Sequence, residues 1–398
     1  IYPAFYSIIR GEDMFHISDP KDIKQGKVTD VYFDRTVRIL KEKNLDKRVV
    51  AEVRAHHLPP GYEWAVLSGV DEILYLLEGL RVEVQCMPEG TIFHSFEPVL
   101  NIEGSYSEFA KYETPLLGLL CQASGVATRA ARCKKASAGK PIYHFGARRM
   151  HPGITPMIDR ASFIGGCDGV AVGRSAQMLK EEPVGTIPHA LVLLVGDTVK
   201  ATRLFHEVIE PKVRRVALID TLGDEKFEAL RIAEDLGDDL FAIRLDTPPS
   251  RRGDFLELLK EVRWELDLRG FRKVKLFISG GMDEEKIRLL APMADAFGVG
   301  TWISNAPVVD FSLDIVEIEG KPFSKRGKFS GRKQVWRCSS CFSTQILPVD
   351  RTPGKCSCGG DFAHLLEPVI ERGKLIKSLP SPQEIRKYVL EQLEKVQI

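Results

Sequence analysis

The sequence lacks an excess of charge of either sign. It has 56 Lys and Arg against 55 Asp and Glu, which gives the 398 residues a formal net charge of +1. Proteins that bind nucleic acid through its phosphates usually concentrate basic residues, so no nucleic-acid partner is expected. The sequence also lacks an apolar run of the roughly 20 residues that span a bilayer. The apolar stretch 116–123 is interrupted by Gly118, so we expect a core helix there and no membrane partner.

A secretory signal is missing as well. The chain begins at Ile1, and residues 1–13 have neither the basic start nor the small-residue cleavage site of a signal peptide. We interpret residues 1–13 as an extension or a misassigned start, with Met14 as an alternative first residue, and we expect a cytoplasmic protein. The length predicts two or three domains.

Residues 1–120 have the pattern of a mixed α/β domain. The Val-rich runs 49–55 and 63–69 are bounded by Pro, Gly and polar residues, as strands are. Segment 70–80 places Ile73, Leu76, Leu77 and Leu80 on one face, which is typical of an amphipathic helix. Further strands are expected at 82–87 and 98–106.

The rhythm changes near residue 140, where short Val- and Ile-rich runs alternate with amphipathic segments such as 255–266, which Gly270 is placed to end. Apolar strands separated by helices indicate a parallel sheet. Seven of them in about 160 residues indicate a complete or incomplete barrel, which we place at 121–309. The seven runs are 142–146, 169–173, 183–188, 215–221, 240–246, 274–280 and 296–302.

Polar residues and glycines recur at the ends of these runs. Because active sites of α/β barrels lie at the carboxyl edge of the sheet, we expect a site there. A single such residue, Asp220 for example, would more often be a helix cap, but seven strand ends in succession favour a site. The residues are Arg148, Asp168, His189, Asp220, Asp246, Ser279, Gly280, Gly281, Gly298 and Gly300.

Two of these segments suggest specific chemistry. In 183–191, Thr186 and the preceding glycine are suited to a phosphate, and His189 is suited to act as an acid, a base or a phosphoryl acceptor. In 143–153, Phe145 can stack on a flat ring, and Arg148 and Arg149 can hold a carboxylate or phosphate. Taken alone, each is weak: a lone histidine is more often a surface or core residue, and an Arg pair more often a surface ion-pair partner.

Three further segments carry charge or glycine. The turns at 278–283 and 297–301 resemble the glycine turns with which late barrel strands bind phosphate. Arg244 and Asp246 lie at one strand end, where a carboxylate can hold ribose hydroxyls. The basic segment 324–334 contains Lys328 and Lys333, although a charge run is usually a solvated loop.

Four of the eight cysteines are close together near the C-terminus. Two short pairs separated by fourteen residues are suited to tetrahedral zinc, and four thiolates leave no open position, so the zinc would be structural. Disulfides are the alternative, which a cytoplasmic protein disfavours. We place a small zinc-knuckle domain at 335–398, with ligands Cys338, Cys341, Cys356 and Cys358.

Eight motifs occur together in an order that resembles nicotinate phosphoribosyltransferase, in a form with a C-terminal zinc knuckle found among archaea. They are 29–33, 145–152, 165–170, 183–191, 243–253, 278–281, 297–301 and 325–335, and the resemblance covers nearly the whole chain from Met14. It implies a type II phosphoribosyltransferase fold. That fold has an N-terminal α/β sandwich, to which strands near 310–335 return, and a seven-stranded, incompletely closed α/β barrel.

The resemblance also implies residue roles. His189 matches the histidine that ATP phosphorylates, with Asp220 and Asp246 in the catalytic group. Phe145 matches the ring that stacks on the pyridine of nicotinate, and Arg148, backed by Arg149, the cation near it. Tyr32 resembles a tyrosine that reaches the site of a partner subunit, which implies a homodimer with shared sites or a higher oligomer of dimers.

Other matches concern phosphoribosyl pyrophosphate. Asp168 lies where related enzymes place a carboxylate beside the base, Thr186 in the loop near the pyrophosphate, and Arg244 with Asp246 near the ribose. The residues matched to the 5′-phosphate are Ser279, Gly280, Gly281, Gly298 and Gly300, with Lys328 and Lys333 adding charge. The implied cofactors are Mg²⁺, whose ligands are not assigned, and ATP, besides structural Zn²⁺.

Three alternatives stay open. Quinolinate phosphoribosyltransferase resembles this fold and also makes nicotinate mononucleotide, but those enzymes are shorter and a phosphohistidine motif such as 185–189 counts against it. A nicotinamide-using relative is the second. The third is a docking role for the zinc ribbon toward a protein or RNA.

Overall fold

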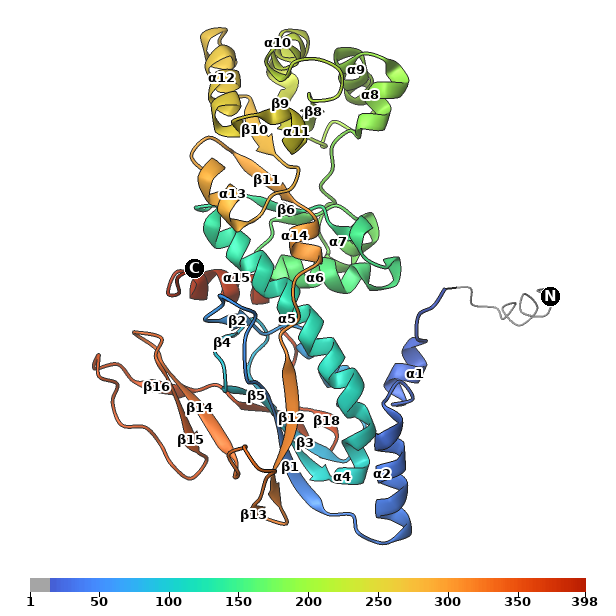
Figure 1. Ribbon diagram of the computed structural model, residues 1–398, viewed down its shortest axis with the longest axis vertical. Helices are drawn as coiled ribbons and strands as arrows, with labels where there is room; N and C mark the ends of the chain where they lie inside the picture. Colours follow the sequence, from blue (N-terminus) through green and yellow to red (C-terminus); the bar gives the residue numbers. More distant parts are fainter. Residues whose placement is uncertain (1–14) are drawn as a thin grey trace, which may run out of the picture.

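The structure is a computed structural model that describes residues 15–398; the expected extension 1–13 lies outside the described residues. The fold has two main parts, one above the other in Figure 1, and the long helix α5 (Glu113–Ala136) runs from one into the other. No helix in residues 15–398 is long and apolar enough to cross a membrane. The stretch 116–123 belongs to α5, as expected of a core helix.

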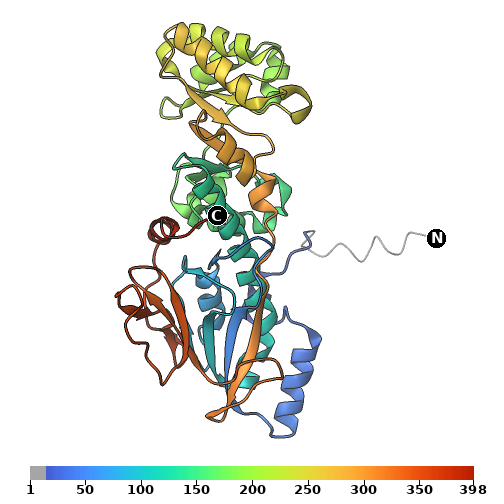
Figure 2. The same ribbon diagram turned by 60° about the vertical axis from the view of Figure 1, so that its left-hand side comes forward.

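The lower part is an α/β sandwich around a seven-stranded antiparallel sheet, in the order β13-β12-β1-β5-β3-β17-β18. Strand β1 is buried at every position after its first because both faces of the sheet are covered. Figure 2 shows α2 and α5 on one side of this sheet and a small three-stranded sheet on the other. The strands are β1 (Arg48–Ala55), β3 (Val82–Cys86), β5 (Pro98–Ser105), β12 (Phe311–Ile318), β13 (Lys321–Pro322), β17 (Glu367–Glu371) and β18 (Lys374–Leu375).

Short helices and one strand pair complete the sandwich. Helix α3 buries Ile73, Leu76 and Leu77, the apolar face expected from the sequence. The run 63–69 forms only the two-residue strand β2, which pairs with β4. The bounds are α1 (Pro20–Lys24), α2 (Val31–Glu42), β2 (Ala65–Val66), α3 (Val70–Leu77), β4 (Ile92–Phe93), α4 (Tyr106–Phe109) and η1 (Ala110–Tyr112).

The upper part is a half-barrel with a six-stranded parallel sheet, in the order β7-β6-β11-β10-β9-β8. The edge strands β7 and β8 are not paired with each other, so the barrel is incomplete. The strands are β6 (Ile142–His144), β7 (Gly169–Val170), β8 (Arg215–Leu218), β9 (Leu240–Leu245), β10 (Lys275–Ile278) and β11 (Ala296–Val299).

The expected number of seven barrel strands is corrected to six. Run 183–188 is not a strand; it is an irregular segment between α7 and α8, held to β7 by the bond from Val184 N–H to Val170 O (2.9 Å). Pro183 and Pro188 have no N–H to donate to a ladder, and Gly185 has no side chain to pack.

Helices cover the outside of the half-barrel. Helix α12 buries Phe255, Leu259, Val262 and Leu266, and Gly270 follows its end with a φ of +91°. The helices are η2 (Ala147–Arg149), η3 (Pro152–Ile154), α6 (Thr155–Ile164), α7 (Gly173–Leu179), α8 (His189–Val195), α9 (Thr198–Val208), α10 (Glu225–Leu236), η4 (Gly237–Asp239), α11 (Pro249–Arg252), α12 (Phe255–Leu268), α13 (Glu284–Leu290) and α14 (Thr301–Ser304).

The chain after residue 332 divides among three places. Strands β14 (Lys333–Cys338), β15 (Thr344–Pro348) and β16 (Phe362–His364) form the small cysteine-bearing sheet. Strand β17 then pairs with β3 of the sandwich, and α15 (Pro382–Leu393) packs on α6 beside the half-barrel. The small cysteine-bearing sheet therefore spans fewer residues than the zinc-knuckle domain expected at 335–398.

Candidate active site

The carboxyl ends of the barrel strands line a cavity of about 690 Å³. Parallel pairing places these ends at one edge of the sheet, so residues far apart in sequence meet there. Ten of the residues selected from the sequence line this cavity: Phe145, Arg148, Arg149, Arg244, Asp246, Ser279, Gly280, Gly281, Gly298 and Gly300.

The ring of Phe145 lies over the backbone of β11. The backbone N–H of Phe145 donates to Val299 O (2.8 Å), which fixes the end of β6 against β11. A Cβ atom on Gly298 would lie 2.6 Å from the Phe145 ring, so only glycine allows the ring to sit there. The half-buried Phe145 ring lies 5.7 Å from that of Phe277, measured between centroids, and Phe145 also lines the cavity.

Behind Phe145, a buried histidine ties the same strand ends together. His144 Nδ1 lies 2.6 Å from Asp159 Oδ1 on α6, and its Nε2 lies 3.2 Å from Ser304 Oγ on α14. The network connects β6 to the segment that follows β11, which holds the two sides of the cavity in register.

Arg244 organises one wall of the cavity. Its guanidinium donates to Thr186 Oγ1 (2.9 Å), Ser279 Oγ (2.9 Å) and Asp246 Oδ2 (3.0 Å), and its Cζ lies 5.4 Å from the centroid of the Phe145 ring. Burial lowers the pKa of Arg244, and the carboxylates of Asp246 and Asp220 oppose that change. The bonds join the ends of β9 and β10 to the 183–188 segment, so Arg244 positions these groups as well as supplying charge.

His189 begins helix α8 and faces two carboxylates. Its Nε2 lies 3.5 Å from Asp246 Oδ2 and 3.8 Å from Asp220 Oδ2, while its Nδ1 lies 2.9 Å from Thr221 Oγ1. The imidazole is 42% exposed, whereas the Asp220 side chain is 1% exposed. Burial raises the pKa of Asp220, and His189 opposes that rise. Neither oxygen of Asp220 has a hydrogen-bond partner within residues 15–398. A buried carboxylate in that state calls for a cation or a proton donor.

The turn after β10 allows a ligand to approach the backbone closely. Gly280 and Gly281 have φ values of +84° and +65°, a left-handed conformation that glycine adopts without strain. Turns of this kind form concave backbone surfaces that bind anions. Arg148 and Arg149 on η2 line the same cavity and are exposed. The cavity thus combines an aromatic face, carboxylates, and glycine turns flanked by cations.

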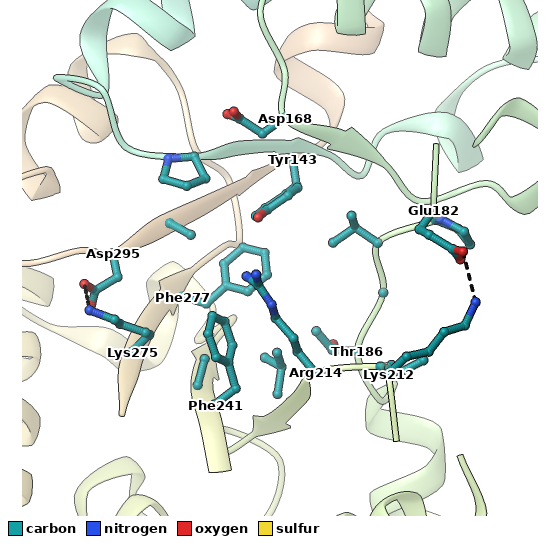
Figure 3. A pocket seen from close by; sticks show the side chains of 18 residues that line it. Tyr143, Asp168, Glu182, Thr186, Lys212, Arg214, Phe241, Lys275, Phe277 and Asp295 are labelled. Carbon is teal, nitrogen blue, oxygen red and sulfur yellow. Dashed lines mark hydrogen bonds and ion pairs between the residues drawn. The ribbon is translucent and has the colours of Figure 1, made fainter. Parts of the chain in front are cut away.

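Asp168 lies elsewhere. It precedes β7 instead of following a strand, and it lines a second cavity of about 490 Å³ with Tyr143 and Thr186 (Figure 3). Its carboxylate accepts from Lys134 Nζ (2.7 Å) on α5 and Arg386 (2.7 Å) on α15. The structure therefore places Asp168 where α5, α15 and the start of β7 meet, and not in the lining of the Phe145 cavity.

Tyr32 and Lys328 lie in the sandwich of the same chain, and Lys333 is the first residue of β14 in the small cysteine-bearing sheet. Tyr32 is 55% exposed on α2, which Figure 1 shows far below the half-barrel. Lys328 Nζ lies 2.6 Å from Asp314 Oδ2, and Lys333 Nζ donates to Glu52 Oε2 (2.9 Å). A single chain does not bring these three residues to the Phe145 cavity.

The four C-terminal cysteines meet at one point. Their Sγ atoms lie within 4.8 Å of one another, with Cys338–Cys358 and Cys341–Cys356 each at 3.5 Å, and no disulfide joins them. A tetrahedral zinc ion with Zn–S bonds of about 2.3 Å places its sulfurs about 3.8 Å apart. The cluster is consistent with a structural zinc site, in which each pair of thiolates comes from one tight turn.

The main cavity is also lined by residues that were not selected from the sequence, and two of them stand out. Arg129 on α5 and Trp302 on α14 both line it, and the guanidinium carbon of Arg129 lies 3.8 Å from the centroid of the Trp302 ring. A signal for Arg129 existed: it is one of two arginines, with Arg132, in a helical stretch of otherwise mostly small residues, 123–133. Trp302 follows the turn 297–301 that was expected to bind phosphate, but the sequence indicated no role for the Trp302 side chain itself.

Comparisons with known proteins agree with this geometry. The sequence profile described as quinolinate phosphoribosyl transferase, N-terminal domain, matches residues 30–124. The profile of the C-terminal domain of the same family matches residues 126–314. Together they cover the sandwich strands that precede α5 and the whole half-barrel.

Individual proteins are similar as well. The crystal structure described as nicotinate-nucleotide pyrophosphorylase from Pyrococcus furiosus is 55% identical, with a TM-score of 0.95 over 97% of this chain and 100% of that chain. A nicotinate phosphoribosyltransferase of Mycobacterium tuberculosis is 29% identical over 354 residues, 78% of this chain and 74% of the relative. Human nicotinic acid phosphoribosyltransferase, 18% identical with a TM-score of 0.75 over 92% of this chain and 94% of that chain, shares the fold.

Proposed function

Because the chain belongs to the type II phosphoribosyltransferase family, we propose that it forms nicotinate mononucleotide and pyrophosphate from nicotinate and phosphoribosyl pyrophosphate, coupled to ATP hydrolysis through phosphorylation of His189. Family membership makes it a pyridine-base phosphoribosyltransferase of NAD synthesis. The proposal concerns which base it uses and how ATP takes part.

The observation that carries the ATP coupling is the environment of His189. In the tautomer in which Nδ1–H donates to Thr221 Oγ1, at 2.9 Å, Nε2 carries the lone pair on the side of Asp246. This nitrogen would attack the γ-phosphorus of ATP: the N–P bond forms, the bond to the bridging oxygen breaks, and ADP leaves. Hydrolysis of the phosphohistidine by water returns the free imidazole and inorganic phosphate.

Mg²⁺ fits the carboxylates beside His189. Asp220 has two buried oxygens without a hydrogen-bond partner in the described structure, and Asp246 adds carboxylate oxygens nearby. Hard cations such as Mg²⁺ prefer oxygen ligands. Asp220 and Asp246 would hold the ion, which when bound supplies positive charge against phosphate oxygens.

The pyridine ring would stack on Phe145, with its carboxylate toward Arg148. An aromatic pair contributes about 0.5–1.5 kcal/mol beyond burial, and an arginine gives a planar fork for a carboxylate. We propose that Tyr32 of the partner subunit covers the other face of the ring, because Tyr32 is exposed and lies far from Phe145 in its own chain. The base would then be held between two aromatic faces.

Phosphoribosyl transfer needs little acid–base chemistry and much positioning. The pyridine nitrogen forms a bond to the anomeric carbon while the bond to the pyrophosphate oxygen breaks. Asp246 is placed to bind ribose hydroxyls, and the 280–281 turn to approach the 5′-phosphate. Positive charge that develops on the ribose leaves negative charge on pyrophosphate, which Arg149 and the cation held by Asp220 would stabilise.

Quinolinate is the second candidate base, because the matching profiles and the name of the Pyrococcus furiosus structure point toward it. Quinolinate carries two carboxylates and calls for additional convergent cations. Of the cavity-lining cations, Arg244 is engaged by Asp246 and Lys286 by Asp283, which leaves fewer for a dianionic base. The exposed His189 also has no evident use in quinolinate chemistry, so nicotinate is favoured.

Steady-state kinetics with each base test the proposal. Purified protein would receive phosphoribosyl pyrophosphate with nicotinate, quinolinate or nicotinamide, each with and without ATP. We expect the highest kcat/KM for nicotinate, increased by ATP. A higher kcat/KM for quinolinate, with CO₂ released, would identify the enzyme as a quinolinate phosphoribosyltransferase.

A further inference from the structure

Arg129 is a buried cation whose guanidinium has no anionic partner. It lies in the middle of α5, is 9% exposed, and lines the Phe145 cavity. Within residues 15–398 it makes no hydrogen bond or ion pair, and its Nε is buried without an acceptor. By contrast Arg132, one turn further on, donates to Glu284 Oε2 (2.9 Å).

Aromatic rings hold the Arg129 side chain in place of a carboxylate. Its guanidinium carbon lies 3.8 Å from the centroid of the Trp302 ring and 5.8 Å from that of Tyr62. Stacking of this kind positions the planar group and leaves its edge N–H groups available for an acceptor. A buried charge without a counter-ion costs free energy of folding. The geometry therefore fits a cation whose counter-ion is an anionic ligand.

The backbone fixes this cation beside the turn that follows β11. Trp302 comes directly after Gly300 and Thr301, which line the same cavity. A Cβ atom on Gly125 would lie 2.3 Å from the carbonyl oxygen of Pro307, so glycine there lets the segment after α14 lie directly against α5. The distance between the Arg129 helix and the glycine turn is thereby set by packed backbone.

We propose that Arg129 binds the 5′-phosphate of phosphoribosyl pyrophosphate and so selects a phosphorylated ribose. This inference rests on the proposed function, because it takes phosphoribosyl pyrophosphate as the substrate. A phosphate monoester presents oxygens that match the arginine fork. The neighbouring acidic groups of the cavity are engaged, Asp246 by Arg244 and Asp283 by Lys286, so they do not compete for Arg129.

Two probes separate this role from its alternatives. Ribose 5-phosphate carries the 5′-phosphate alone, and inorganic pyrophosphate stands for the leaving group. Calorimetric titration of the full-length protein with each probe would be compared for the wild type, Arg129→Gln and Arg129→Lys. Arg132→Gln is the matched control, because Arg132 comes from the same helix and also stacks on Tyr62, at 4.0 Å. Melting temperatures of all variants report on folding.

For Arg129→Gln we expect ribose 5-phosphate binding to weaken about 10- to 100-fold, the loss typical of a charged hydrogen bond. Pyrophosphate binding should change less than about twofold, Arg129→Lys should recover part of the loss, and Arg132→Gln should bind as wild type. Weaker binding of pyrophosphate alone, or a lower melting temperature with both affinities unchanged, would overturn the inference. If Arg129→Gln does not fold, Arg129→Lys with wild-type affinity would overturn it. Wild-type protein that binds neither probe would overturn the proposed function as well.

Discussion

The Nε2 atom of His189 lies 3.5 Å from Oδ2 of Asp246, so the first residue of α8 meets the residue that follows β9. This contact places the expected phosphoryl acceptor next to the expected ribose ligand. A change in the charge of the imidazole would therefore alter the electrostatic potential at the proposed ribose site, which is the route that we propose for coupling ATP to the transfer.

His189→Ala should abolish the stimulation of product formation by ATP and leave a slow reaction that does not need ATP. The reason is that, among the described residues, no imidazole other than that of His189 pairs with Asp220 or Asp246. Rates of ADP and nicotinate mononucleotide formation check this, with His206→Ala, an exposed histidine on α9, as control. Unchanged ATP hydrolysis in His189→Ala would remove this residue from the mechanism.

Mixing two inactive variants should restore activity if the site is shared between subunits. In a head-to-tail dimer, a chain with Tyr32→Ala and one with Arg148→Ala form one site with both changes and one site with neither. Random reassembly of equal amounts should then give about a quarter of the wild-type sites. Size-exclusion chromatography and activity after mixing would be measured. No recovery from a mixture that has exchanged subunits would place Tyr32 in its own chain's site or outside any site.

The four-cysteine cluster should hold one zinc per chain, as elemental analysis of the purified protein would show. Cys341→Ser should lower the zinc content and the melting temperature more than the turnover of the molecules that remain folded, because four thiolates leave no position for substrate. Cys121→Ser, from half-buried sequence in α5, is the control and should retain the metal. Protein that contains no zinc when purified without chelators would contradict this prediction.

The carboxylate of Asp314 should stabilise the sandwich above about pH 4. Burial alone would raise its pKa, but hydrogen bonds from Lys325 (2.8 Å) and Lys328 (2.6 Å) outweigh burial and lower the pKa to about 2. The stabilisation is present above the unfolded pKa near 3.8 and is lost as the pH falls through the folded pKa.

For Asp314→Asn we therefore expect a loss on the order of 2 kcal/mol at pH 7 that shrinks between pH 4 and pH 2. Melting temperatures of both proteins across this range would be compared. The exposed Asp310→Asn is the control and should show little loss at any pH. A difference that stays constant down to pH 2 would show that the effect is steric and not due to charge.

The strands and helices that could be predicted are those whose burial follows from local pattern. The runs 49–55, 215–221, 240–246 and 274–280 contain β1, β8, β9 and β10 because apolar side chains recur over lengths typical of strands. Segment 183–188 looks similar in composition, but its prolines cannot complete a ladder. The pairing of β17 with β3 depends on residues almost three hundred positions apart, which no local pattern encodes.

The same distinction applies to the cavity. Residues just after strands were predicted to meet because parallel strands share an edge, and Phe145, Arg244, Asp246 and Gly298 do line one cavity. Asp168 is held instead by Lys134 and Arg386, which come from helices that the sequence did not place beside it. The roles of these residues in binding and catalysis stay predictions until the variants are measured.

The most direct test of the central claim is the initial rate of product formation by wild-type protein, with phosphoribosyl pyrophosphate and either nicotinate or quinolinate, in the presence and absence of ATP. The account predicts that nicotinate gives nicotinate mononucleotide and pyrophosphate at a rate that ATP increases, with ADP formed alongside, and that quinolinate gives no CO₂. Release of CO₂ from quinolinate at the higher rate, unaffected by ATP, would contradict it.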